Sequence, residues 1–351
     1  MFRRSALPTA VAGIGVVLLA LAGCKIQVQD ASPAGTADGA TGAAVTGATS
    51  ISRAGSLTIE PSGGFSPVYN LIGHAKHSIN VTMYEFSDTT AEHDLAAAAG
   101  RGVSVRVILD HRAKSINADA YSYFRSHHVK VTWSSSDYRY THQKTITADG
   151  SKAIIMTANL TSRYYATSRD FLVTDTSRAD ISAITAVFNA DFAKHSVKPG
   201  DGSDLVWSPT DSQDQMIALI NGAKSSLRIY SEEMGDATVE KALIAAAKRG
   251  VKVQVCGENE SSEYDDDFSE LAKGGVRISY YSSSKGFYIH GKVIEADYGT
   301  SHARIFIGSE NFSNTSLNQN RELGLITSSH AVMSAMASTF AADFQNGKKW
   351  S

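Results

Sequence analysis

An internal duplication constrains the fold of this chain more than any other feature of its sequence. The segment 56–198 recurs as the segment 204–349, and residues of the first copy have counterparts 148 positions further on. Four extra residues around Gly299 lengthen this distance to 152 in the last part of the second copy. A repeating unit of this length has the size of a domain. The chain therefore contains one such unit twice, and a site built from equivalent residues has two matching halves.

Extended apolar runs alternate with helical stretches in each copy. Strands that are apolar along their whole length and separated by helices are typical of α/β layers, in which both faces of a sheet are covered. We therefore predict an α/β fold of two units related by a pseudo-twofold axis, each a mixed β-sheet flanked by helices, with the active site between them. In the first copy the pattern predicts strands near Ile79 and over 103–109, 129–133, 144–147, 153–157 and 171–174, and helices over 96–99, 121–125 and 181–192.

The N-terminus is typical of an export signal. Arg3 and Arg4 precede an apolar run over 10–22 that is too short to span a membrane comfortably and ends in Leu-Ala-Gly-Cys. This ending resembles a bacterial lipobox, which implies cleavage before Cys24 and lipidation of its thiol. An uncleaved anchor helix and an ordinary signal peptide with a chance cysteine are the alternatives, and all three export the rest of the chain. We expect a membrane lipoprotein of the cell envelope, at the outer membrane if the source is a diderm.

Residues 25–55 are predicted to form a disordered tether. They are mostly Ala, Gly, Thr and Ser, with too few large apolar side chains to offset the entropy lost on ordering. A flexible segment of this length reaches on the order of 30 Å. The predicted domains are therefore a signal peptide over 1–24, the tether, a first repeat over 56–200 and a second repeat over 201–351.

The charge balance argues against an extended nucleic-acid surface. Without the two arginines of the predicted signal, the chain has 31 basic and 35 acidic side chains, which gives a formal charge of −4. Lipidation of Cys24 leaves Cys256 as the single free thiol, so that neither an intramolecular disulfide nor a thiolate metal site can form. We predict no metal site and no cofactor, and we expect a monomer.

A pair of short motifs is the candidate for the chemistry. His142 and Lys144 recur as His290 and Lys292, and an aspartate follows five residues after each lysine. Residues i and i+2 of a strand project from one face, so each histidine is predicted to lie beside its lysine. A single His-x-Lys-x4-Asp arises by chance with a probability of roughly 0.03 in a chain of this composition. Two copies in register are a much stronger signal.

These paired motifs, followed by Gly308-Ser309-Glu310-Asn311 in the second copy, resemble the phospholipase D superfamily over nearly the whole chain beyond the tether. The resemblance implies two phospholipase D-like units and metal-independent cleavage of a phosphodiester through a phosphohistidine. It implies that His142 is the nucleophile and His290 the general acid and base, although the pseudosymmetry also allows the reverse. Lys144 and Lys292 are expected to bind the phosphoryl oxygens.

The resemblance also assigns helpers to the two motifs. Each histidine needs an acceptor on its second ring nitrogen, and Asp170 and Glu322 stand at equivalent positions for that role. Asp149 and Asp297 are expected to fix a turn between two strands and not to react. The residues expected to bind the substrate phosphate are Asn159, Asn311, Ser309 and Thr157.

The two copies are not identical around the predicted phosphate pocket. The first has Met156-Thr157 where the second has Gly308-Ser309, so one half of the pocket is expected to be tighter or less polar. Glu85 and Glu233 occupy matching strand ends. The sequence leaves open whether these two glutamates line the cleft or form structural hydrogen bonds.

The leading prediction is a phospholipase D that cleaves phospholipid head groups by hydrolysis or by transfer to an alcohol, because a lipid anchor on Cys24 would hold it at a membrane. A non-specific endonuclease of the same superfamily is the nearest alternative, since the chemistry does not depend on what esterifies the phosphate. A cardiolipin-synthase-like transferase is a third reading. A catalytically idle envelope binding or scaffold protein is the alternative of another class, and two intact motifs argue against it. The expected partners are a phospholipid substrate and the membrane, with nucleic acid less favoured.

Overall fold

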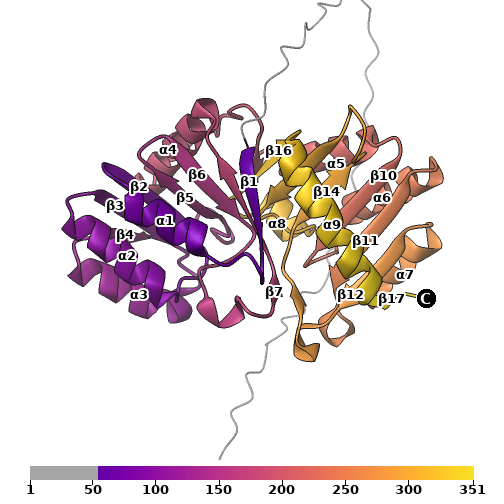
Figure 1. Ribbon diagram of the computed structural model, residues 1–351, viewed down its shortest axis with the longest axis horizontal. Coiled ribbons are helices and arrows are strands. Elements are labelled where there is room, and N and C mark those ends of the chain that lie inside the picture. Colours follow the sequence, from indigo (N-terminus) through magenta and orange to yellow (C-terminus); the bar gives the residue numbers. More distant parts are fainter. Residues whose placement is uncertain (1–53) are drawn as a thin grey trace, which may run out of the picture. The chain divides into compact units, whose positions relative to one another are not determined.

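The computed structural model describes residues 54–351 of the chain. The predicted signal peptide, the lipidation site Cys24 and all but the last two residues of the predicted tether lie outside the described residues, so their assignment stays a prediction. Within the described residues, two similar α/β halves follow the two copies of the repeat. They are coloured indigo to magenta and orange to yellow in Figure 1.

The first half is built on a seven-stranded mixed sheet with the order β1-β8-β6-β5-β2-β3-β4. The strands β2, β3 and β4 run parallel, and the other neighbouring pairs are antiparallel. The strands of this sheet are β1 (Ala54–Ile59), β2 (Ser78–Met83), β3 (Ser104–Leu109), β4 (Lys130–Trp133), β5 (Lys144–Ala148), β6 (Lys152–Met156) and β8 (Phe171–Asp175). The helices of this half are α1 (Ser66–His74), α2 (Thr89–Gly100), α3 (Lys114–Ser126) and α4 (Arg178–Ala193).

The second half repeats this arrangement in an eight-stranded sheet with the order β17-β12-β11-β10-β14-β15-β16-β9. Here β10, β11 and β12 run parallel, and the short edge strand β17 is added beside β12. The strands are β9 (Leu205–Ser208), β10 (Ser226–Ser231), β11 (Lys252–Glu258), β12 (Arg277–Tyr281), β14 (Val293–Ala296), β15 (Arg304–Gly308), β16 (Glu322–Thr327) and β17 (Lys348–Lys349). The helices are α5 (Ser212–Gly222), α6 (Ala237–Lys248), α7 (Asp265–Lys273), α8 (Asn314–Asn318) and α9 (His330–Asn346).

Helices α2 and α6 show how equivalent residues begin and end equivalent elements. Each is preceded by an aspartate, Asp88 or Asp236, whose carboxylate accepts hydrogen bonds from backbone N–H groups of the first turn. Each is followed by the sequence Arg-Gly-Val, where Gly102 and Gly250 have φ angles of 90° and 89°. Glycine adopts this left-handed conformation without steric cost, so the chain can turn there into the next parallel strand.

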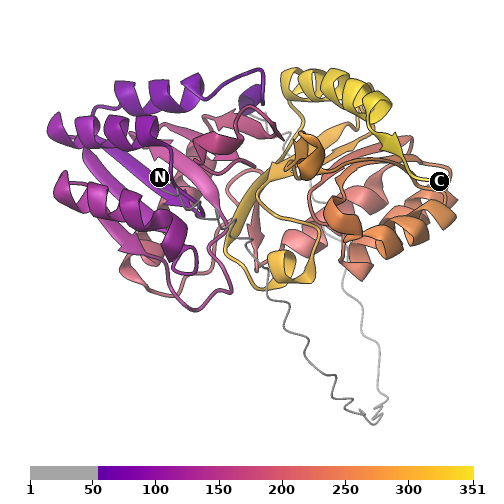
Figure 2. The same ribbon diagram turned by 90° about the horizontal axis from the view of Figure 1, so that it is seen from below.

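Three apolar cores stabilise the described residues. One lies between the first sheet and α1, α2 and α3, and another lies between the second sheet and α5, α6 and α7. The third contains side chains of both halves, among them Ile155, Phe171, Trp207 and Phe340. Figure 2 shows the two halves side by side. Because their inner faces share a core, the central strands are buried on both sides, and the halves belong to one folding unit.

The α/β fold class predicted from the sequence is confirmed by the two mixed sheets and their helices. Every strand and helix predicted for the first copy is present close to its predicted range. The sequence did not indicate α1, which has only nine residues, or β1, an edge strand that begins inside the predicted tether. Among residues 54–351 no helix is both long enough and apolar enough to cross a membrane.

Candidate active site

The two His-Lys motifs lie where the halves meet. The strand β7 (Ser168–Arg169) of the first half pairs in parallel with β13 (Tyr288–Ile289) of the second. The backbone N–H of His290 then donates to the Arg169 carbonyl at 3.2 Å, and the backbone N–H of His142 donates to the Arg321 carbonyl at 3.0 Å. Each motif is therefore fixed at its histidine to the opposite half.

The motifs are not continuous strands, which corrects the prediction from the sequence. Strand β5 begins at Lys144, and β14 begins just after Lys292, so both histidines precede their strands. Both lysine side chains are fully buried. The ammonium of Lys144 donates to the carbonyl oxygen of His142 at 2.6 Å, and Lys292 makes the same bond to His290. Each lysine is thus held against the backbone of its own motif, and neither is among the residues that line the cavity described below.

Each histidine is oriented by an acid from the other half. His142 Nδ1 lies 2.8 Å from Glu322 Oε2, and His290 Nδ1 lies 2.7 Å from Asp170 Oδ1. The sequence predicted these two acids as the partners of the histidines but did not show that the partners are exchanged between the copies. With Nδ1 engaged, Nε2 is the nitrogen of each ring that can react.

The two orienting acids are themselves held by hydrogen bonds. Asp170 accepts from the hydroxyls of Thr157 and Ser168, both at 2.6 Å. Burial raises the pKa of Asp170, but the charges of His290 and Lys292 and these hydrogen bonds outweigh burial and lower it to about 2. Glu322 is likewise held below its ordinary pKa against burial, chiefly by the charge of His142. Both carboxylates are therefore ionised near neutral pH.

The four predicted phosphate-binding residues fall into two groups. Thr157 also accepts from the Phe171 amide, and the Ser309 hydroxyl bonds both backbone groups of Leu323. Both hydroxyls already form hydrogen bonds within the protein, so neither has a free O–H to donate to a substrate phosphate. The side-chain oxygens of Asn159 and Asn311 are buried and have no hydrogen-bond partner among the described residues. Of the four residues, Asn159 lines the cavity described below.

Asp149 and Asp297 form turns. Asp149 accepts hydrogen bonds from the backbone N–H groups of three successive residues that lead into β2, Lys76, His77 and Ser78, at 2.7 to 2.9 Å. Asp297 makes the equivalent bonds before β10 in the second half. The hydrogen bonds of both residues go to the turns before these strands.

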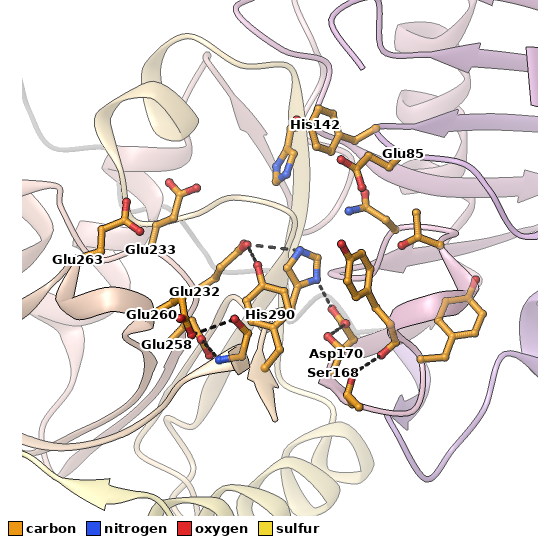
Figure 3. A pocket seen from close by; sticks show the side chains of 18 of the residues that line it. Glu85, His142, Ser168, Asp170, Glu232, Glu233, Glu258, Glu260, Glu263 and His290 are labelled. Carbon is orange, nitrogen blue, oxygen red and sulfur yellow. Dashed lines mark hydrogen bonds and ion pairs between the residues drawn. The ribbon is translucent and has the colours of Figure 1, made fainter. Parts of the chain in front are cut away.

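A cavity of about 550 Å³ contains both histidines. Figure 3 shows the histidines in its centre, with a wall of glutamates on the side of the second half. Among the described residues that line it, the only basic side chains are those of His142 and His290. The seven carboxylates of the lining are Glu85, Asp170, Glu232, Glu233, Glu258, Glu260 and Glu263. Glu85 and Glu233, whose role the sequence left open, therefore line the cavity.

Glu232 is the residue nearest the chemistry that the sequence analysis missed. Its carboxylate contacts Lys292 Nζ, lies 3.6 Å from His290 Nε2 and accepts a hydrogen bond from the Tyr288 hydroxyl. The charges of His290 and Lys292 hold its pKa well below the ordinary range in spite of burial. The equivalent residue of the first copy is Tyr84, and this difference between aligned positions was the signal that could have identified it.

The first half of the site is less charged than the second. The Tyr84 ring lies 4.6 Å from the His142 ring and 5.1 Å from Lys144 Nζ. Burial lowers the pKa of His142, and Glu322 only partly opposes this effect. Burial also lowers the pKa of Lys144, to about 7. Near neutral pH the first half of the site therefore holds a neutral imidazole and a partly charged amine.

This arrangement provides what phosphodiester cleavage requires. One Nε2 can attack phosphorus, the other can exchange a proton with the leaving or entering oxygen, and two ammonium groups can neutralise the phosphoryl oxygens. Among residues 54–351 no group of three or more His, Cys, Asp or Glu side chains is arranged to hold a metal ion.

Comparison with protein families gives two matches in one chain. The model described as "Cardiolipin synthase, PLD-like domain" matches residues 68–193 and 216–344, and each match falls within one of the predicted repeats. A search of curated proteins found no match.

Solved structures with the same fold come from several bacteria. Polyphosphate kinase from Porphyromonas gingivalis superposes with a TM-score of 0.64 at 15% identity, over 82% of this chain and 50% of the kinase, so the chain spans half the length of that protein. Phosphatidylserine synthase from Haemophilus influenzae Rd KW20 gives 0.64 at 12% identity, over 84% and 87%. Nuc, a phospholipase D family member from Salmonella typhimurium, gives 0.38 at 22% identity, over 42% and 95%. At these identities the first two likenesses show the fold alone.

Proposed function

The chain belongs to the family described as "Cardiolipin synthase, PLD-like domain", which confirms the predicted membership of the phospholipase D superfamily, and we propose that it is a phospholipase D-type enzyme. In this proposal it cleaves the head-group phosphodiester of a phospholipid. The superfamily acts on phosphodiester bonds, so the kind of bond follows from the family. The group that esterifies the phosphate must be inferred from the cavity.

The observation that favours a phospholipid is the acidic wall of the cavity, which consists of the glutamates of the second half in the lining. These are Glu232, Glu233, Glu258, Glu260 and Glu263. A phosphodiester between His142 and His290 would direct one of its two alcohol groups toward the glutamates of the second half (Figure 3). A unit charge about 4 Å from a carboxylate interacts with on the order of 4 kcal/mol at an effective dielectric constant of about 20. A head group with an ammonium is attracted by such a wall, whereas the neighbouring phosphates of a nucleic acid are repelled. The tyrosine rings of Tyr264 and Tyr288 in the same lining suit an ammonium as well.

In the proposed reaction, His142 Nε2 attacks phosphorus while the bond from phosphorus to the leaving oxygen breaks. His290 gives its Nε2 proton to that oxygen, and a phosphohistidine remains. His290 then takes a proton from water, whose oxygen attacks phosphorus as the P–N bond breaks. This second step restores neutral His142 and protonated His290. An alcohol in place of water gives transfer instead of hydrolysis.

The predicted lipid on Cys24 supports a membrane substrate, because it would hold the enzyme at the surface where phospholipids are found. Cys24 lies outside the described residues, so lipidation, export and residence in the cell envelope are proposed on the sequence alone. A nuclease of the same superfamily is the alternative that the acidic wall disfavours.

Substrates offered in parallel test this proposal. The chain from Lys25 onward is incubated with phosphatidylcholine, phosphatidylglycerol and plasmid DNA. We expect cleavage of phosphatidylcholine, slower cleavage of phosphatidylglycerol and intact plasmid. The double variant Glu233→Gln and Glu263→Gln removes two acidic side chains of the wall and should reduce the preference for phosphatidylcholine. Cleavage of DNA in preference to either lipid would contradict the proposal.

A further inference from the structure

The two halves of the site differ most at one pair of equivalent positions, Tyr84 and Glu232. Each residue directly follows the first parallel strand of its sheet, β2 or β10. The Tyr84 ring lies 4.6 Å from the His142 ring. The Glu232 carboxylate contacts Lys292 Nζ and lies 3.6 Å from His290 Nε2. A neutral ring therefore faces one histidine, and an anion faces the other.

We propose that Glu232 is a positioning residue that holds His290 Nε2 for proton donation to the leaving oxygen and thereby makes His290 the general acid and His142 the nucleophile. This inference rests on the phosphodiesterase function proposed above. The family resemblance of the paired motifs implies the same order of the two histidines, but the motifs are alike and their pseudosymmetry also allows the reverse.

His290 faces more negative than positive charge. Asp170 Oδ1 lies 2.7 Å from its Nδ1, and Glu232 Oε2 lies 3.6 Å from its Nε2. Glu85, from the first half, adds a further negative charge near His290 in the same cavity. The nearest ammonium is that of Lys292, on the same motif. A carboxylate therefore lies near each ring nitrogen of His290.

His142 has the opposite surroundings. Its single carboxylate partner is Glu322, at 2.8 Å. Burial is the main cause of the lowered pKa of His142. The charge of Glu322 opposes it, and the charges of Lys144 and Lys292 add to it. The Tyr84 ring beside it brings no charge. Neutral His142 keeps the electron pair on Nε2 that attack on phosphorus requires.

Glu232 can stay beside His290 when a substrate phosphate binds to Lys292. The Lys292 ammonium has three N–H groups. One donates to the His290 carbonyl and one faces Glu232, so a third remains for a phosphoryl oxygen. The other carboxylate oxygen of Glu232 is held by the Tyr288 hydroxyl, whose ring lies 5.2 Å from that of His290. Glu232 is therefore fixed on both sides.

The choice of leaving group separates this role from a structural one. In the first step the bond from phosphorus to the leaving oxygen breaks, and the proton of His290 Nε2 passes to that oxygen. An alkoxide needs this proton, whereas p-nitrophenolate is stable without it. Removal of the charge at Glu232 should therefore slow the cleavage of alkyl esters and spare aryl esters.

The test compares the wild-type chain with Glu232→Gln, which keeps the size of the side chain and removes its charge. The two substrates are phosphatidylcholine in detergent micelles and bis(p-nitrophenyl) phosphate. We expect kcat for phosphatidylcholine to fall about 10- to 100-fold, and kcat for the aryl diester to change by less than about threefold.

Glu295→Gln is the matched control, because it makes the same substitution at a buried glutamate of the same half that pairs with Arg228 and does not line the cavity. It should leave the ratio of kcat for the two substrates as in the wild type. Tyr288→Phe, which removes only the hydroxyl that holds Glu232, should give a smaller loss with the same selectivity. This variant decides the question if Glu232→Gln fails to fold.

Two results would overturn the inference. Equal losses on both substrates would mean that Glu232 only supports the structure. Faster cleavage of the aryl diester by Glu232→Gln would make His290 the nucleophile. A wild-type chain that cleaves neither substrate would overturn the proposed function, and this inference with it, and that result differs from both of the others.

Discussion

His142 and Glu322 come from different copies of the repeat, and a hydrogen bond of 2.8 Å joins Nδ1 of the histidine to Oε2 of the glutamate. His290 and Asp170 form the reciprocal pair at 2.7 Å. Each histidine is therefore oriented by the half to which it does not belong. Such a site exists only when both copies pack against each other, as they do across their shared apolar core.

Glu322→Gln should lower kcat by about 10²- to 10⁴-fold, because an amide can neither fix the tautomer of His142 reliably nor stabilise the imidazolium. Steady-state kinetics with phosphatidylcholine measures the loss. Glu295→Gln is a suitable control, since Glu295 is a buried glutamate of the same half that pairs with Arg228 away from the histidines. A kcat within a few fold of the wild type in Glu322→Gln would show that the cross-pairing is dispensable.

The pH dependence of kcat/KM should follow the protonation of the Lys144 amine. Burial lowers its pKa to about 7, and a group that must be protonated is lost as the pH rises through its pKa. We therefore expect kcat/KM to fall above about pH 7, because the neutral amine no longer attracts the phosphoryl oxygens. Lys144→Arg keeps its charge and should move the fall to higher pH. A wild-type kcat/KM that stays constant well above neutral pH would be incompatible with this role.

Asp149→Asn should affect stability and not chemistry. Asp149 accepts three backbone hydrogen bonds before β2, and the loss of its charge should lower the free energy of unfolding by about 2 kcal/mol. Urea denaturation measures this change, and kcat should stay close to the wild-type value.

The effect of Asp149→Asn should itself depend on pH. Burial raises the pKa of Asp149, but its hydrogen bonds to backbone N–H groups outweigh burial and lower it. The stabilisation is therefore complete at neutral pH and is lost as the pH falls through the pKa of the folded state. The gap between variant and wild type should narrow in acid. A large loss of kcat at unchanged stability would place Asp149 in the chemistry after all.

Chelation should leave the reaction unchanged, since the proposed steps use only histidine, lysine and water. Activity toward phosphatidylcholine is measured before and after dialysis against EDTA. Full activity is expected. An activity that vanishes and returns only with zinc or calcium would refute the proposed mechanism.

The two copies, the α/β layers and the pairing of the two His-Lys motifs could be predicted from the sequence, because these depend on periodicity and on residues that recur at one spacing. It did not predict the exchange of acids between the copies. His142 and Glu322 are 180 residues apart, and only the packing of the two sheets decides which copy of an acid meets which histidine.

The acidic wall could not be predicted either. Its glutamates come from separate segments at the ends of β10 and β11 and from the loop that follows. Single glutamates at strand ends are common on protein surfaces, so none of them is a signal on its own. Glu232 was missed for another reason. Its counterpart in the first copy is Tyr84, and a comparison that looks for identical residues in the two copies does not select positions at which they differ.

The turnover of His142→Ala and His290→Ala, each measured on phosphatidylcholine with thermal unfolding as the check of folding, tests most directly whether the two copies form one site. A single shared site predicts that each substitution abolishes activity and leaves the thermal transition within a few degrees of the wild type. Two independent sites would each contribute, so retention of about half of the activity in either variant would contradict the account.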